Sequence, residues 1–169
     1  MQNSDLKKTF LASMRAVTST VNVISASHEG ERHAMTATSV TSLSLDPSML
    51  VCVNKDASIH KILSEGSHFS INILSSSQRE LAEVCSNSDE GESRFVNESW
   101  KDQGSYIYNT DALSTLFCLK INEIDHTSHT IFIGRVEKAI NNDELKPLLY
   151  GMGGYLYCLL YTSPSPRDA

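Results

Sequence analysis

Hydrophobic and polar residues alternate along several short stretches of the chain, and this pattern predicts β-strands. In residues 68–74, Phe69, Ile71 and Ile73 alternate with Ser70 and Asn72, as a strand with one buried face requires. Two longer stretches, 113–125 and 130–140, flank the polar sequence HTSH and predict an antiparallel hairpin. Residues 20–27 predict a strand that enters another hairpin at Gly30, and residues 49–54 predict a short buried strand.

Helical spacing of apolar residues appears in three places. The first predicted helix begins at Ser4 or Asp5, and its apolar residues should pack against another element; they are Leu6, Phe10, Met14 and Val17. A short helix over residues 59–65 is expected to start at Ser58 and to end at Gly66 in a left-handed cap. The third, over residues 75–86, opens with Ser75 and Gln78 at capping-box spacing.

The remaining segments complete a fold that is mainly β with short helices. Residues 86–111 are the most polar part and predict a long loop, while residues 147–161 form a last apolar piece with a glycine-rich loop. Many short strands without a strand-helix repeat indicate a closed or nearly closed antiparallel barrel with helices at its ends. We expect one domain over residues 1–158 and a disordered or non-native tail over residues 159–169.

Composition and charge exclude several classes of partner. The 169 residues include 14 Lys and Arg against 20 Asp and Glu, a formal net charge of -6, which argues against nucleic-acid or anionic-membrane binding. Neither a membrane-length apolar run nor a secretory signal is present, so a cytoplasmic location is expected. The four cysteines lie far apart without a C-x-x-C pair and are interpreted as reduced, mostly buried side chains.

The stretch HAMTATSVTSLSLDPSML, residues 33–50, is unusually rich in hydroxyl groups. It holds three threonines and four serines, and Asp46 is its first charged residue when His33 is neutral. Periodicity alone makes this stretch a solvated edge strand, with Asp46 and Pro47 forming the turn into the next strand.

In order along the chain, several motifs together resemble one known arrangement. They are MTATSVTSLSLDPSMLVCVN, S-x-H-x-x-L, F-x-I-N-I-L-S-x-x-Q, R-F at Arg94 and Phe95, SHTIFIGRV, and PLLY followed by GGY. From about Phe10 to Tyr155 the chain is similar to the flavin reductase family with an FMN-binding split-barrel fold. Within that family it resembles the small reductase components of two-component aromatic monooxygenases, and the resemblance implies an antiparallel split barrel that forms homodimers.

The resemblance also implies a flavin site, FMN or FAD, in two parts. The hydroxyl-rich segment would line the isoalloxazine ring and ribityl chain through Met35, Thr36, Ala37, Thr38, Ser39 and Val40. Small hydroxyls and backbone amides can meet the polar edge of a neutral ring without adding charge. The flavin phosphate would lie near the end of the following strand and the start of the next helix, at Val53, Asn54, Lys55, Ser58 and His60.

Three further residues are implied on the nicotinamide side. His129 matches the family's histidine near the reacting face of the flavin, although its turn reads Thr127, Ser128, His129 and lacks the family's glycine. Tyr155 resembles the aromatic residue near the nicotinamide, and Arg15 would meet a dinucleotide phosphate. Because hydride transfer needs only correct placement of the two rings, His129 is interpreted as a positioning residue with a catalytic role.

The resemblance therefore implies that the chain is an NAD(P)H:flavin oxidoreductase that supplies reduced flavin to a separate monooxygenase. The alternative from a different class is a flavin-binding module that holds FMN as a carrier, sensor or structural partner; a pyridoxal-type oxidase is a third possibility within the fold. Without the resemblance, His129 would be an ordinary surface residue in a turn. His126 and His129 have no third metal ligand nearby in sequence, so no metal site is expected, and the missing G-x-G-x-x-G motif disfavours a Rossmann dehydrogenase.

Overall fold

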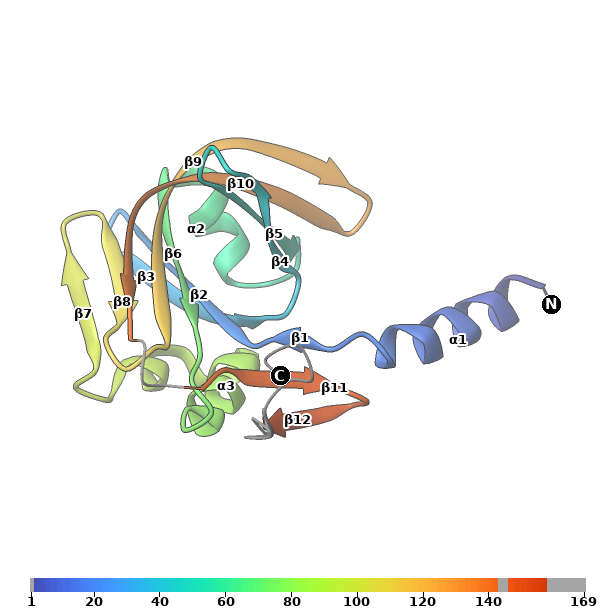
Figure 1. Cartoon of the computed structure of the whole chain (residues 1–169). Coiled ribbons are helices and arrows are strands. Elements are labelled where there is room, and N and C mark those ends of the chain that lie inside the picture. The colour runs from blue at the N-terminus through green and yellow to red at the C-terminus, as the bar shows by residue number, and fades with distance from the viewer. Residues whose placement is uncertain (1, 143–145, 158–169) are drawn as a thin grey trace, which may run out of the picture.

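The computed structural model describes residues 2–142 and 146–157, and an antiparallel barrel forms its centre (Figure 1). The barrel is a seven-stranded sheet in the order β3-β2-β6-β9-β10-β5-β4. Its strands are β2 (Asn22–His28), β3 (Glu31–Ala37), β4 (Val40–Ser44), β5 (Ser48–Asn54), β6 (His68–Ile73), β9 (Ser114–His126) and β10 (His129–Asn141). The predicted β9-β10 hairpin and the hairpin at Gly30 are both confirmed.

The hydroxyl-rich stretch closes this barrel. Strands β3 and β4 are the two opposite edges of the sheet, and Thr38 and Ser39 alone separate them in the chain. At this crossing the backbone carbonyl of Ser39 accepts a hydrogen bond from the amide of Cys52 on β5, 3.1 Å away. Asp46 and Pro47 lie in the turn between β4 and β5, as predicted.

The barrel interior is filled by apolar side chains from strands and from helix α2 (Ile59–Glu65). Ile59, Ile62 and Leu63 of α2 pack into this core together with Phe69 and Phe132. Gly134 allows close packing at a bulge in β10, because an added Cβ would lie 2.6 Å from the ring of Phe69 and 2.8 Å from Cβ of Cys118.

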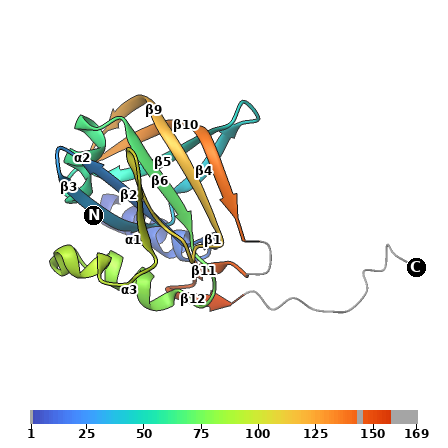
Figure 2. The ribbon, with the colours of Figure 1, turned by 90° about the vertical axis from the view of Figure 1, so that its left-hand side faces the viewer.

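A second layer covers one outer face of the barrel (Figure 2). It contains helix α3 (Arg79–Ser86), the 3₁₀ segment η1 (Ser88–Phe95) and the hairpin of β7 (Trp100–Gln103) and β8 (Tyr106–Asn109). Strands β1 (Ser19–Thr20), β11 (Leu148–Gly151) and β12 (Gly154–Tyr157) form a separate three-stranded sheet beside it. Val21, Leu74, Ala82 and Leu148 belong to the apolar core that joins these layers.

The second layer corrects the prediction that β6 has only one buried face. Ser70 and Asn72 are as buried as their apolar neighbours, because β8 covers their side of the strand. The Asn72 amide donates to the carbonyl of Val23 and to Ser25, and its oxygen accepts from the amide N–H of Asn109. This buried amide therefore ties the barrel to the β7-β8 hairpin, since each of these groups would otherwise lose its hydrogen-bond partner.

Other predictions about elements need correction. Residues 86–111 are not a loop: they form η1, β7 and β8, whose side chains Phe95, Trp100 and Ile107 are buried. Gly66 is extended, with φ -81°, so the left-handed cap was wrong; the glycine is needed because a Cβ would lie 2.7 Å from the carbonyl oxygen of Ile62.

The first helix, α1 (Gln2–Arg15), starts slightly earlier than predicted and projects away from the barrel (Figure 1). Its predicted packing is wrong for a single chain, because four of its apolar side chains are exposed: Leu6, Phe10, Leu11 and Met14. Helix α3 begins at Arg79, and only half of the predicted capping box is present, with the Gln78 side chain accepting from the amide of Ser75 at 3.0 Å.

Two predictions concern residues outside the described range. The tail over residues 159–169 and Cys158 lie outside it, while Cys52, Cys85 and Cys118 are free cysteines, of which the last two are buried. No helix among the described residues is long and apolar enough to span a bilayer.

Candidate functional site

Two neighbouring pockets open beside the crossing between β3 and β4. One, of about 530 Å³, is lined by Thr36, Thr38 and Tyr155 among others, and the second, of about 630 Å³, by Thr38, Ser39 and Arg15. Both include Thr38, Tyr150 and Gly153, so they adjoin one another at the crossing. We call them together the crossing pockets.

Strand geometry divides the six predicted ring-site residues among different environments. Ala37 belongs to the barrel core, and Met35 and Val40 pack against it. Thr36 points to the other side of β3, where its hydroxyl donates to the carbonyl of Ala82 on α3 at 2.6 Å. Of these six residues, Thr38 at the exposed crossing lines both crossing pockets, Thr36 lines only the smaller one and Ser39 only the larger one.

The crossing pockets also bring together residues from distant parts of the sequence. Arg15 comes from the end of α1 and Tyr155 from β12, so both predicted nicotinamide-side residues lie beside the hydroxyl groups. Burial and nearby Glu83 raise the pKa of the Tyr155 phenol, which stays protonated at neutral pH.

Sequence reasoning missed a cation in this region. The Arg79 guanidinium lies 5.3 Å from the centre of the Tyr155 ring, and its Nε donates to Glu83 at 2.8 Å. Arg79 lines the smaller crossing pocket together with Thr36 and Thr38. It occurs inside a helical pattern and pairs with a glutamate four residues later, which in a sequence indicates only an ordinary solvated helix face.

The predicted phosphate residues lie around the end of β5, the start of α2 and the β9-β10 turn. The amide of Lys55 donates to the carbonyl of Ser128 at 2.9 Å, which holds the end of β5 against that turn. Asn54 is paired in register with His129, and its side-chain oxygen accepts from the amide of Asp56. Ser58 makes no side-chain capping bond to α2 within the described residues, so the predicted cap is not formed.

Four side chains form a connected polar group that we call the lysine cluster: Lys55, His60, Asp125 and Thr130. The Lys55 ammonium lies 3.3 Å from Oδ1 of Asp125, and the same oxygen accepts from Thr130 Oγ1 at 2.7 Å. Thr130 is buried, and its Oγ1 also lies 2.8 Å from Nε2 of His60. The hydrogen bonds from Thr130 and then from Lys55 lower the pKa of Asp125, so its carboxylate is charged at neutral pH.

This chain of contacts fixes the direction of the hydrogen bond between His60 and Thr130. A threonine hydroxyl carries one hydrogen, and that hydrogen is donated to Asp125. His60 Nε2 must therefore donate to Thr130. Of the four side chains, Lys55 carries the ammonium that can meet a phosphate.

His129 lies at the exposed end of the β9-β10 turn. Its Nδ1 is 2.9 Å from Oγ of Ser128, and this contact orients the ring. Thr127 adopts a positive φ of 47° in this turn, a backbone conformation that favours glycine. The two-residue turn therefore forms although it contains no glycine.

Strand β5 connects the crossing to the lysine cluster. The backbone of Ser39 is hydrogen-bonded to that of Cys52. Two residues farther along β5, Asn54 is paired in register with His129. Between them, Val53 is fully buried in the core, so only its backbone can face a ligand. Strand β5 thus runs from its contact with the crossing at Ser39 to the predicted phosphate residues at its end.

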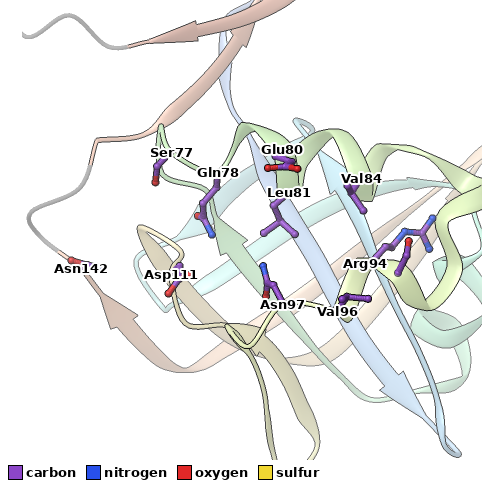
Figure 3. Close-up of a pocket in the computed structure, with 11 residues that line it drawn as sticks. Ser77, Gln78, Glu80, Leu81, Val84, Arg94, Val96, Asn97, Asp111 and Asn142 are labelled. Atoms are coloured by element: carbon purple, nitrogen blue, oxygen red, sulfur yellow. The ribbon is translucent and has the colours of Figure 1, made fainter.

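A different pocket, of about 640 Å³, contains none of the predicted site residues (Figure 3). It lies beside α3 and is lined by polar groups of both charges, including Glu80, Arg94 and Asp111, and by Leu81. It shares no lining residue with the crossing pockets and does not include His129.

Comparisons with known proteins identify relatives of the whole folded region. Residues 14–158 match the family model described as flavin reductase like domain. The reductase component of FADH(2)-dependent resorcinol hydroxylase from Rhizobium sp. (strain MTP-10005) is 34% identical over 150 residues, which cover 86% of this chain and 84% of that relative. A flavin reductase (NADPH) from Lentzea aerocolonigenes is 35% identical over 78% of each chain.

Solved structures agree on the fold. The crystal structure of BorF, the flavin reductase component of a bacterial two-component tryptophan halogenase, has a TM-score of 0.82 and 28% identity, covering 89% of this chain and 97% of that chain. The barrel of Figure 1 is accordingly the split barrel that the motifs implied. With the family model spanning nearly all of the described residues, the chain belongs to the flavin reductase family.

Proposed function

We propose that this protein is an NAD(P)H:flavin oxidoreductase that supplies reduced FMN or FAD to a separate monooxygenase. The observation that carries the proposal is that β5 of a flavin reductase barrel contacts the crossing at Ser39 and ends beside His129 and Lys55. The names of its relatives, reductase components of two-component monooxygenases, support the oxygenase partner.

The residues present fit a flavin. The crossing pockets are within the usual size range of cofactor sites and offer uncharged hydroxyls at Thr38 and Ser39. Lys55 supplies a cation for the phosphate at the other end of the site. When bound, the flavin supplies the hydride acceptor for NAD(P)H.

The chain's own residues would orient the two ligands. Thr38 and Ser39 would hold the ring edge, and His129, fixed by Ser128, would position the nicotinamide against it. Arg15 and Arg79 flank the crossing pockets and would meet dinucleotide phosphates, with Tyr155 beside them. Placing the two rings in contact supplies the orientation that the reaction requires, so no side chain has to form a covalent bond.

We further propose that the active form is a homodimer and that it acts in the cytoplasm. The exposed apolar residues of α1 need cover, because a single helix of 14 residues projecting into water is only marginally stable. The family resemblance makes a second copy the partner that covers them. The three described cysteines are free, which suits a reducing compartment.

The test is to mix the purified protein with NADH or NADPH and a small amount of FMN or FAD, and to follow the nicotinamide absorbance. Catalytic oxidation of NADH or NADPH is expected, and it should stop when flavin is omitted. A flavin-dependent oxygenase added to the mixture should form its own product faster than without this protein. Flavin that binds without any oxidation of NADH or NADPH would overturn the reductase function and favour a non-catalytic flavin module.

A further inference from the structure

We propose that Asp125 weakens the binding of the flavin phosphate by competing with it for Lys55. This inference rests on the proposed function and deepens it, because it concerns the same phosphate site. Within the lysine cluster, Lys55 is the cation expected to meet the phosphate, yet its ammonium is already paired with Oδ1 of Asp125 at 3.3 Å.

The geometry of Asp125 makes it a fixed competitor. Thr130, which is buried, donates to the same carboxylate oxygen at 2.7 Å and is itself held by His60 at 2.8 Å. A carboxylate held in this way keeps its position beside Lys55 with little loss of side-chain freedom. Any phosphate that binds Lys55 must either displace this contact or share the ammonium with a second negative charge.

The exposure of the pair sets the size of the effect. The side chain of Asp125 is 71% exposed and that of Lys55 is 38% exposed, so water screens their attraction strongly. At such an exposed site, removing the competition of Asp125 for Lys55 is expected to change the dissociation constant of the flavin phosphate by roughly two- to fivefold. The consequence is a flavin that is held loosely at its phosphate and is released readily after reduction.

The substitution that tests this competition is Asp125→Asn. Asparagine keeps an oxygen that can accept from Thr130, so the contacts of Thr130 and His60 are retained, whereas the negative charge beside Lys55 is removed. Glu123→Gln is the matched control, because Glu123 lies two residues earlier on β9 and pairs with Lys120 at 3.0 Å instead of with Lys55. Both variants lose one charge, but only the first releases Lys55.

The measurement is the dissociation constant of FMN and of riboflavin, which lacks the phosphate, by quenching of flavin fluorescence. Asp125→Asn should bind FMN roughly two- to fivefold more tightly and riboflavin unchanged, whereas Glu123→Gln should leave both constants unchanged. Adding Lys55→Met to Asp125→Asn should abolish the gain. Circular dichroism of each variant checks that the fold is retained.

Other outcomes overturn the proposal. FMN affinity that is unchanged or weaker in Asp125→Asn, or a gain that riboflavin shares, would show that Asp125 does not compete with a phosphate. Equal gains in Asp125→Asn and Glu123→Gln would assign the effect to overall charge and would also overturn it. In each case wild-type oxidation of NADH with added FMN would continue, so failure of this inference is distinguishable from failure of the proposed reductase function.

Discussion

The imidazole of His129 is held by Ser128 beside the lysine cluster. The backbone of His129 pairs in register with that of Asn54. Replacing His129 with alanine should slow flavin reduction by about tenfold, because the nicotinamide loses a positioning contact. The flavin dissociation constant should stay within about twofold, since the phosphate and ring contacts lie elsewhere. Stopped-flow reduction and a flavin titration measure the two quantities.

His126→Ala is the matched control for that experiment, because His126 lies directly opposite His129 on β9. It should leave both the reduction rate and the flavin affinity unchanged. Collapse of flavin affinity in His129→Ala would place this residue in the flavin site itself and would contradict the positioning role.

Ser39 is exposed at the crossing and lines the larger crossing pocket. Leucine at this position should fill the space of the ring and raise the flavin dissociation constant by about tenfold or more. Thr41→Leu, on the exposed part of β4 outside the crossing pockets, adds similar bulk and should leave the constant unchanged. An unchanged constant in Ser39→Leu would rule out the ring contact.

His33 is a half-buried residue whose Nε2 accepts from the buried guanidinium of Arg94 at 2.5 Å. Burial, and then the charge of Arg94, lower the pKa of His33 from 6.5 to about 4, so the folded protein holds it neutral. Between these two values the unfolded chain binds the proton more strongly, and the free energy of unfolding therefore falls as the pH drops from 6.5 to 4.

Urea unfolding at pH 7.5 and 4.5 measures this contribution. His33→Gln, which keeps an acceptor for Arg94 but does not titrate, should lose less stability than the wild type over that range, by on the order of 2 kcal/mol. Equal losses in the two proteins would show that His33 is accessible to protons in the folded state.

At the scale of elements, the bulge of β10 at Gly134 is a close-packed point of the barrel. Gly134→Ala should lower the free energy of unfolding by about 1–3 kcal/mol, because its Cβ would overlap the buried ring of Phe69 and the Cβ of Cys118. Gly154→Ala is a suitable control, since an added Cβ there meets no atom within 4 Å. Similar stability losses in both variants, measured by chemical denaturation, would contradict the packing argument.

The sequence predicted elements well where one physical signal dominates. Alternation in Phe69, Ile71 and Ile73 identified β6, and the polar turn between two long alternating stretches identified the β9-β10 hairpin. The segment from Ser86 to Asp111 was mistaken for a loop because its charged and small residues outnumber its large apolar residues, Phe95, Trp100 and Ile107. These three side chains become buried only when the segment folds onto the barrel.

Site residues were predictable to the extent that a motif carried them. Thr38, Ser39, Lys55 and His129 stand in the motifs, but their division between a core side and a pocket side depends on strand register. Arg79 and Asp125 could not be found in this way, since each acquires its partner from contacts that an isolated sequence does not show. The buried role of Asn72 was also hidden, because its covering strand follows 34 positions later, at Tyr106.

For the whole molecule, the exposed apolar face of α1 gives a prediction about assembly. Light scattering coupled to size exclusion should report twice the mass of one chain. Replacing Leu6 and Phe10 with glutamate should shift the protein toward the monomer, because charge on this face opposes its burial. Replacement of the exposed Lys7 and Lys8 with glutamine is the control, and a monomer in the wild type would contradict the proposed dimer.

The two-residue crossing at Thr38 and Ser39 limits how this protein can be redesigned. Most binding sites on loops can be reshaped by changing loop length, but here the same two residues span the gap between the edge strands of the barrel. An inserted or deleted residue would shift β4 against β5 and turn its side chains to the opposite face. Efforts to alter flavin preference should therefore exchange side chains at the crossing and keep its length fixed.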